Sequence, residues 1–311
     1  MPSPPQTGTG RNTANPHEQR LPEPEPDQQP SRSQPSAPAI VLTIAGFDPS
    51  SGAGITADLK VFAASQLYGV SAVTALTVQS TQGVRRSEPV DPGLLRETLL
   101  YLQQDLPLAG IKIGMLGSGE NVATVAEWLA LSGVPRSRIV LDPILRSSSG
   151  RALLDEPGSA NLKDRLLPLV GWITPNIDEL AVLTGHPPAA NLDQMLASAQ
   201  ALAASGPEGL YIVATGGHLD PPDDLLLLPS GEPHWFPGQR IATRATHGTG
   251  CAFSSVLLCR LVLGDDPPAA VATAKQYVME AMQAAYPIGH GRGPLHHFYA
   301  GLPAAEPRKE R

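Results

Sequence analysis

The residues with the clearest chemical potential are Thr246-His247-Gly248-Thr249-Gly250-Cys251, which precede an apolar stretch with helical character. Two glycines ahead of a helix start can expose several backbone N–H groups in one pocket, and the positive end of the helix dipole adds to their effect. Such a pocket stabilises the negative charge of a phosphoryl group during its transfer. The same helix start favours the thiolate form of Cys251, whereas a cysteine considered alone is more often an inert buried thiol.

A second glycine-rich segment, Gly46-Phe-Asp-Pro-Ser-Ser-Gly-Ala-Gly-Ile-Thr-Ala-Asp58, lies between a predicted strand and a predicted helix. Its glycines permit close backbone approach, and the helix start that follows can hold an anion or a polar ring. Residues 52–57 also match the GxGxxA dinucleotide fingerprint. That match is weak, because the first glycine should follow the strand directly and the next strand should end in an acidic residue rather than precede Gln79.

A third segment, Thr174-Pro-Asn-Ile-Asp-Glu179, places an amide and a carboxylate three residues apart at a helix start. Asn176 and Glu179 can share one face there and suit a hydrated Mg²⁺, which needs few protein ligands. The same pair is also nearly a capping box, a purely structural arrangement, and both interpretations stay open. Asp142, which closes a predicted strand, is a further candidate for the metal neighbourhood.

Composition excludes several classes of protein. The chain has 311 residues, with 22 Lys and Arg against 29 Asp and Glu and only 5% aromatic residues, which argues against a nucleic-acid partner. It has two cysteines without CxxC spacing, so neither a disulfide framework nor a structural zinc site is expected. It lacks a secretory signal and an apolar run of membrane-spanning length. We therefore expect a cytoplasmic enzyme that acts on a small molecule.

The elements that must position these segments alternate between strand and helix, which predicts an α/β fold with a mainly parallel sheet. The predicted strands are 40–45, 70–78, 110–115, 138–141, 169–174 and 209–214, followed by a hairpin of 225–228 and 232–236. The predicted helices are 55–67, 94–102, 121–131, 177–183, 192–204, 251–263 and 269–286. Ligands of such sheets bind beyond the carboxyl ends of the strands, where the glycine-rich and polar segments lie.

The ends of the chain differ from the rest in composition. Residues 1–38 hold ten of the 33 prolines and almost no apolar side chains, so they cannot offset the entropy of ordering and are predicted to be a disordered arm. Residues 39–304 contain enough apolar residues for one sizeable core and are predicted to form a single domain. Residues 305–311 form a charged tail.

Eight ordered blocks across residues 39–300 resemble the hydroxymethylpyrimidine/phosphomethylpyrimidine kinases of thiamine biosynthesis, within the ribokinase-like superfamily. The blocks are LTIAGFDPSSGAGITADLK (42–60), YGVSAVTALTVQST (68–81), KIGML (112–116), LDPILRSSSG (141–150), ITPNIDELAVLTG (173–185), TGGH (215–218), THGTGC (246–251) and HGRGPLHHF (290–298). The resemblance implies a three-layer fold, with a central mainly parallel sheet flanked by helices, and a homodimer.

The resemblance also implies roles for individual residues. The pyrimidine would bind near Gly46, Asp58, Gln79 and Met115, and the backbone of Gly248, Thr249 and Gly250 would form the anion hole. Cys251 would take the proton of the substrate hydroxymethyl group. Asp142 and Glu179 would lie at the Mg²⁺. The side chain of Asn176 and the Thr215–Gly217 segment would help to position ATP.

Two positions depart from the commonest family pattern. Many members carry lysine where this chain has Ser148, and many carry lysine where it has Thr215. Phosphate neutralisation contributes much of the catalysis of phosphoryl transfer, so the loss of two cations bears on nucleotide affinity. Arg146 stands two residues from Ser148, and its guanidinium suits phosphate, so we expect it to replace one of these charges.

The leading prediction is a kinase that uses ATP and Mg²⁺. It would phosphorylate 4-amino-5-hydroxymethyl-2-methylpyrimidine and then the monophosphate, giving the pyrophosphate. A pyridoxine/pyridoxal kinase is a close alternative, because the ring and hydroxymethyl group are similar. A catalytically weak pyrimidine-binding regulator is an alternative of another class, suggested by Ser148 and Thr215. A NAD-dependent oxidoreductase is disfavoured because the fingerprint at 52–57 is weak.

Overall fold

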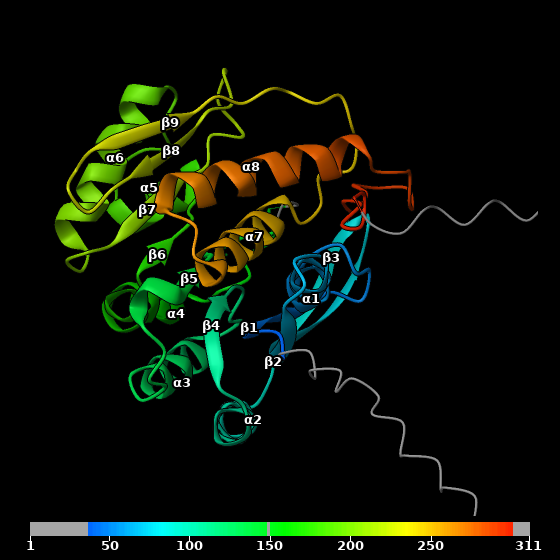
Figure 1. Ribbon diagram of the computed structural model, residues 1–311, viewed down its shortest axis with the longest axis vertical. Coiled ribbons are helices and arrows are strands. Elements are labelled where there is room, and N and C mark those ends of the chain that lie inside the picture. The colour runs from blue at the N-terminus through cyan, green and yellow to red at the C-terminus, as the bar shows by residue number, and fades with distance from the viewer. Residues whose placement is uncertain (1–36, 148–149, 301–311) are drawn as a thin grey trace, which may run out of the picture. The chain divides into compact units, whose positions relative to one another are not determined.

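The computed structural model describes residues 37–147 and 150–300. The predicted arm lies outside these ranges except for its last two residues, and the predicted tail and Ser148 lie outside them as well. The described part of the chain contains one nine-stranded sheet in the order β3-β2-β1-β4-β5-β6-β7-β8-β9 (Figure 1). The strands are β1 (Ile40–Phe47), β2 (Tyr68–Ser80), β3 (Gly83–Pro89), β4 (Leu108–Ile113), β5 (Ile139–Leu141), β6 (Trp172–Ile173), β7 (Tyr211–Ala214), β8 (Asp224–Leu227) and β9 (Pro233–Phe236).

The centre of the sheet is parallel and its edges are antiparallel. Strands β2, β1, β4, β5, β6 and β7 pair in parallel, while β3 pairs antiparallel with β2, and β8 and β9 form an antiparallel hairpin beside β7. The predicted parallel sheet and the predicted hairpin are therefore both confirmed. Strand β3 was not predicted, because its sequence GVRRSEP is polar and its side chains are mostly exposed.

Helices cover both faces of the sheet. They are α1 (Gly54–Ala64), α2 (Pro92–Asp105), α3 (Gly119–Leu129), α4 (Glu156–Asn161), α5 (Ile177–Thr184), α6 (Leu192–Ser205), α7 (Thr249–Leu263) and α8 (Pro267–Gln283). A short 3-10 helix spans Arg136–Arg138, and α4 continues through a π turn, Leu162–Leu166, into a 3-10 turn, Leu167–Leu169. Helix α4 and these turns were not predicted, because each is short and irregular.

Two apolar layers result from the alternation of side chains along the central strands. Ile139 and Leu141 of β5 join the core beneath α2, α3, α5 and α6, whereas Val140 between them joins the core beneath α1, α7 and α8. Strands β7 and β8 alternate in the same way. Successive side chains of a strand point to opposite faces, so continuous apolar runs such as these are buried on both sides. The expected three-layer α/β fold is confirmed.

Within the described ranges, no helix combines the length and the apolar character that crossing a membrane requires.

The carboxyl ends of the parallel strands lie at the same edge of the sheet, and the loops that follow these strands begin there. Gly114 N–H donates to Ile44 O, Asp142 N–H to Ile113 O, and Thr174 N–H to Leu141 O, at 2.9, 2.8 and 2.9 Å. Each loop therefore leaves the sheet next to its neighbour. The polar segments identified in the sequence meet at this edge, as ligand sites of such sheets do.

Candidate active site

Two glycine-rich loops interlock at this edge, one between β1 and α1 and the other before α7. Asp48 organises the first loop, since its carboxylate accepts hydrogen bonds from the backbone N–H groups of Ser50, Gly52 and Ala53 at 2.8–3.1 Å. It also accepts a hydrogen bond from His247 Nε2, in the second loop, at 2.8 Å. Burial works to raise the pKa of Asp48, but the hydrogen bonds from His247 and Ser50 prevail and lower it. The carboxylate is therefore ionised, and it joins loops that are 199 residues apart in the sequence.

The close contact of these loops requires glycine at two positions. Gly248 has a φ of +83°, and a Cβ on it would lie 1.9 Å from the carbonyl oxygen of Gly52. Gly54 has a φ of +57°, and a Cβ on it would lie 2.2 Å from the carbonyl oxygen of Gly46. Both conformations disfavour other residues, and both contacts are with backbone that cannot turn aside. These glycines therefore determine how near the two helix starts approach each other.

The helices at the site begin differently from the others. In the described part of the chain, α2, α3, α4, α5, α6 and α8 each begin at a residue whose side chain accepts a backbone N–H of the first turn. Helices α1 and α7, which begin after Ala53 and Gly248, have no side-chain cap. The first N–H groups of a helix have no partner within it, so these two starts keep donors available for an anion.

A cluster of buried charged side chains contacts α7 near its first turns. Lys112 Nζ of β4 lies 3.0 and 3.2 Å from the two carboxylate oxygens of Asp58, and both side chains are fully buried. Asp58 also accepts hydrogen bonds from Thr43 Oγ1 at 2.6 Å and from Ser255 Oγ of α7 at 2.8 Å. Gly114 leaves space for the lysine, since a Cβ there would lie 2.7 Å from Nζ.

This environment corrects the predicted role of Asp58. Its carboxylate is fully buried and both of its oxygens are occupied by protein donors, so it does not present a free group to a pyrimidine. Instead, it holds Lys112 beneath α7. Burial alone would lower the pKa of Lys112, but the carboxylates of Asp58 and Asp142 raise it, so the lysine is charged.

Cys251 lies in the first turn of α7 and is 6% exposed. Burial raises the pKa of its thiol to about 12, although the charge of Lys112 acts in the opposite direction. The expectation that the helix start makes Cys251 a thiolate is therefore wrong for this structure, because removal from water outweighs the nearby positive charge. The thiol lies beside Lys112, and its predicted role as the base stays a prediction.

Asp142 and Glu179 form an acidic pair at the same edge. Asp142 accepts a hydrogen bond from Ser254 Oγ at 3.1 Å and would lie 3.9 Å from a Cβ on Gly250. Burial raises the pKa of Asp142 to about 6. Burial, followed by the charge of Asp142, raises the pKa of Glu179 to about 8. The two carboxyl groups are thus near enough to disfavour each other's ionisation.

The capping interpretation of Asn176 and Glu179 is confirmed. Asn176 Oδ1 accepts the N–H groups of Asp178 and Glu179 at 2.9 Å, and Glu179 Oε2 accepts the N–H of Asn176 at 2.9 Å. The capping box fixes Glu179 beside Asp142, so capping and a role at a metal do not exclude each other.

The predicted substrate side brings Gly46 and Met115 together, and Gln79 lies farther along β2. A Cβ on Gly46 would lie 3.0 Å from Met115 Sδ, and Met115 packs with Ala75 and Leu153 in a small apolar cluster. Gln79, near the end of β2, is half-buried and lies beside His247. An apolar wall with a carboxamide at its edge suits a flat heteroaromatic ring.

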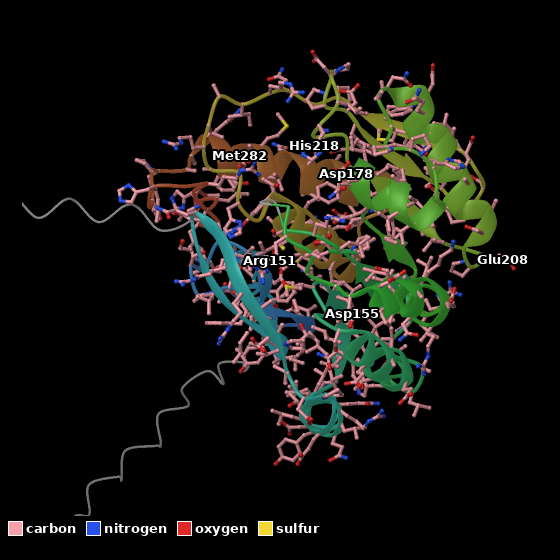
Figure 2. All side chains as sticks on the ribbon, turned by 180° about the vertical axis from the view of Figure 1, so that it is seen from behind. Arg151, Asp155, Asp178, Glu208, His218 and Met282 are labelled. Carbon is pink, nitrogen blue, oxygen red and sulfur yellow. The ribbon has the colours of Figure 1, made fainter. Side chains whose placement is uncertain are left out.

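The predicted nucleotide side is more open. Thr215 N–H donates to Pro175 O at 2.9 Å, which places the loop after β7 beside Asn176, and Gly217 is exposed. His218 Nδ1 lies 3.8 Å from Asp178 Oδ2, and both side chains are exposed (Figure 2).

Arg146 is exposed and lines a depression of about 470 Å³ together with residues of α5, including Asp178 and Val182. The structure thus places it near Asn176 in the fold but outside the buried part of the site. Its predicted contact with phosphate stays a prediction.

Three site residues were missed in the sequence. Asp48 stands two residues after Gly46 in a loop that was noted for its glycines alone, and His247 was given no role within its own segment. Lys112 is a charged residue within the apolar run of β4, and that contrast is the signal that could have identified it.

Comparison with known proteins shows the family to which the chain belongs. A family model described as phosphomethylpyrimidine kinase matches residues 48–296. A hydroxymethylpyrimidine/phosphomethylpyrimidine kinase of Streptomyces coelicolor is 40% identical over 86% of this chain and 97% of its own length. The Escherichia coli protein of the same name is 40% identical over 83% of this chain and 97% of its own length.

Solved structures show the same architecture. The ADP complex of Bacillus subtilis pyridoxal kinase has a TM-score of 0.76 at 28% identity and covers 85% of this chain and 99% of its own. Phosphomethylpyrimidine kinase of Clostridium difficile has a TM-score of 0.68 at 34% identity and covers 78% of this chain and 99% of its own. The expected ribokinase-like fold is confirmed, and the chain belongs to the phosphomethylpyrimidine kinase family.

Proposed function

We propose that this chain transfers a phosphoryl group from ATP to the hydroxymethyl group of 4-amino-5-hydroxymethyl-2-methylpyrimidine, and then a second one to the resulting monophosphate. The observation that carries the proposal is the uncapped start of α7, where Gly248 packs against Gly52 of the first glycine-rich loop and Gly250 lies near the carboxylate of Asp142. The names of the relatives at 40% identity support this choice of substrate.

The donor set fits a magnesium ion. Asp142 and Glu179 are buried carboxyl groups with raised pKa values, and a divalent cation between them would favour the ionised form of both. Within residues 37–147 and 150–300, no three His, Cys, Asp or Glu side chains are arranged to hold a metal ion. Mg²⁺ suits such a site, because it commonly takes one or two carboxylates, with water and substrate phosphates. When bound, it neutralises charge on the phosphates.

Residues of the chain would bind the phosphoryl group, hold the ring and accept the hydroxyl proton. The backbone N–H groups of residues 248–250 receive the transferred phosphoryl oxygens, and Gly46 and Met115 hold the ring in place. Cys251 takes the proton of the substrate hydroxyl. Since its thiol is protonated in the ligand-free protein, the thiol proton must first pass to solvent on substrate binding. Lys112 and the N–H of Gly54 favour this loss because both stabilise the thiolate.

The test is ADP release, measured by a coupled assay with three acceptors: the hydroxymethylpyrimidine, its monophosphate and pyridoxal. We expect turnover with both pyrimidines and at least tenfold lower kcat/KM with pyridoxal. Turnover of pyridoxal alone would support the second candidate, a pyridoxal kinase, which the similarity to solved pyridoxal kinases favours. Tight pyrimidine binding without turnover would indicate a regulator. The homodimer and the cytoplasmic location stay predictions.

A further inference from the structure

His247 contacts three parts of the candidate site. Its N–H donates to Gly293 O at 3.0 Å, and the end of the side chain lies between Asp48 and Gln79, with 13% of the side chain exposed. Gly52 leaves room for the ring, since a Cβ there would lie 2.4 Å from His247 Cδ2. One nitrogen, Nε2, meets both polar neighbours: Asp48 Oδ2 at 2.8 Å and the amide nitrogen of Gln79 at 3.0 Å.

A single ring nitrogen cannot serve both neighbours as they stand. The carboxylate of Asp48 is ionised and can only accept, so Nε2 of His247 must carry a hydrogen and donate it to Asp48. That nitrogen then has no lone pair for the amide hydrogens of Gln79. The contact of His247 with Gln79 is favourable only when the amide oxygen, rather than the nitrogen, faces the ring.

Thr77 imposes the same orientation from the other side of Gln79. Its hydroxyl lies 2.9 Å from Phe47 O and 3.2 Å from the amide oxygen of Gln79. A hydroxyl has one hydrogen and the Phe47 carbonyl can only accept it, so Thr77 is left as an acceptor toward Gln79. Half a turn of the carboxamide places its nitrogen at Thr77, where it donates to the hydroxyl, and its oxygen at His247. There the oxygen shares the single Nε2 hydrogen with Asp48 in a three-centre hydrogen bond.

From this network we infer that His247, oriented by Asp48, is a positioning residue that sets the orientation of the Gln79 carboxamide and thereby the recognition of the substrate ring. This rests on the proposed function. Once the inner hydrogen bonds are made, the amide retains one N–H and one oxygen lone pair, a donor and an acceptor side by side. That pair matches a ring that offers a nitrogen acceptor next to an exocyclic amino donor. Since His247 directly precedes Gly248, the same side chain links ring recognition to the anion loop.

The test compares two replacements of His247 by isothermal titration calorimetry in the full chain. The ligands are the aminopyrimidine substrate and an analogue in which hydrogen replaces the amino group. We expect His247→Leu to weaken binding of the aminopyrimidine about tenfold, as loss of a positioned hydrogen bond does, and to weaken the analogue less than twofold. His247→Gln, which can still donate to Asp48, should keep most of the wild-type preference.

Two further variants distinguish positioning from general damage. In a Gln79→Met background, His247→Leu should produce no further loss of aminopyrimidine binding. His234→Leu, a matched replacement on β9, should leave binding of both ligands as in the wild type. Equal weakening of both ligands by His247→Leu, or additive effects with Gln79→Met, would overturn the inference alone. A wild-type protein that does not bind the aminopyrimidine would overturn the proposed function and this inference with it.

Discussion

The two halves of the candidate site are held in opposite ways. On the substrate side, Asp48 joins two loops and the fully buried pair Asp58 and Lys112 supports the helix that carries Cys251. On the nucleotide side, Gly217 and Arg146 are exposed. Protein contacts between distant segments therefore determine the geometry of the first half, whereas two of the predicted nucleotide residues of the second half face solvent. Substitutions should accordingly be costly in the first half and mild in the second.

The largest effect is expected at Gly248. In Gly248→Ala, the added methyl group would meet the backbone of Gly52 at a positive φ, so the anion loop must move. We expect kcat to fall by about 10²–10³, the loss typical of a damaged oxyanion hole. Gly217→Ala is the comparison from the open half, where a Cβ meets nothing within 4 Å, and should change kcat less than tenfold. ADP release measures both, and similar losses in the two variants would contradict the contrast.

Replacement of Cys251 should come next. Cys251→Ala removes the group proposed to take the hydroxyl proton, so kcat should fall by about 10²-fold with pyrimidine binding largely retained. Cys259→Ala is a matched control, because that thiol lies on the same helix and burial raises its pKa to about 12 as well. Unchanged kcat in Cys251→Ala would refute the role of the thiol in proton transfer.

The buried ion pair should be expensive to break from one side. Lys112→Met leaves the carboxylate of Asp58 unpaired in the core, and we expect it to lower the free energy of unfolding by about 3–5 kcal/mol. The double variant Lys112→Met with Asp58→Asn should recover most of that loss, because no uncompensated charge remains. Urea unfolding monitored by circular dichroism measures both free energies. A loss below about 1 kcal/mol in the single variant would show that the pair contributes little to the stability of the fold.

The acidic pair predicts a pH dependence of stability. Burial raises the pKa of Glu179 to about 8, so its contribution to stability is present below pH 4.5 and is lost as the pH rises toward 8. Glu179→Gln removes that loss, so its melting temperature relative to wild type, without Mg²⁺, should increase from pH 5 to pH 8.5. Added Mg²⁺ should narrow the difference at pH 8.5, whereas a difference that does not vary with pH would exclude this coupling.

The smallest effect is expected at Arg146. Arg146→Ala removes an exposed cation, and exposed charges contribute little because water and salt screen them. We therefore expect the KM for ATP to rise about two- to threefold with kcat unaffected. If the KM for ATP does not change in steady-state kinetics at low salt, Arg146 does not replace the lysines that this chain lacks.

Local patterns in the sequence predicted most of the strands and helices. They could not predict contacts between residues that are far apart in the sequence. The continuous apolar run at Ile139–Leu141 indicates a buried strand, and Asn176 with Glu179 indicates a helix cap, because those signals lie within a few residues. The burial of Asp58 against Lys112 depends on elements 54 residues apart. The substrate contact predicted for Asp58 came from the family resemblance, and no local signal near Asp58 reveals its pairing with Lys112.

The most direct test of the central claim is the product itself. Phosphorus NMR of the wild-type protein with ATP, Mg²⁺ and the hydroxymethylpyrimidine should show a monophosphate ester resonance first. The two resonances of a pyrophosphate ester should then replace it as ADP accumulates. If ATP stays intact, or if only pyridoxal yields a phosphate ester under the same conditions, the assignment of this site to successive phosphorylation of the pyrimidine is contradicted.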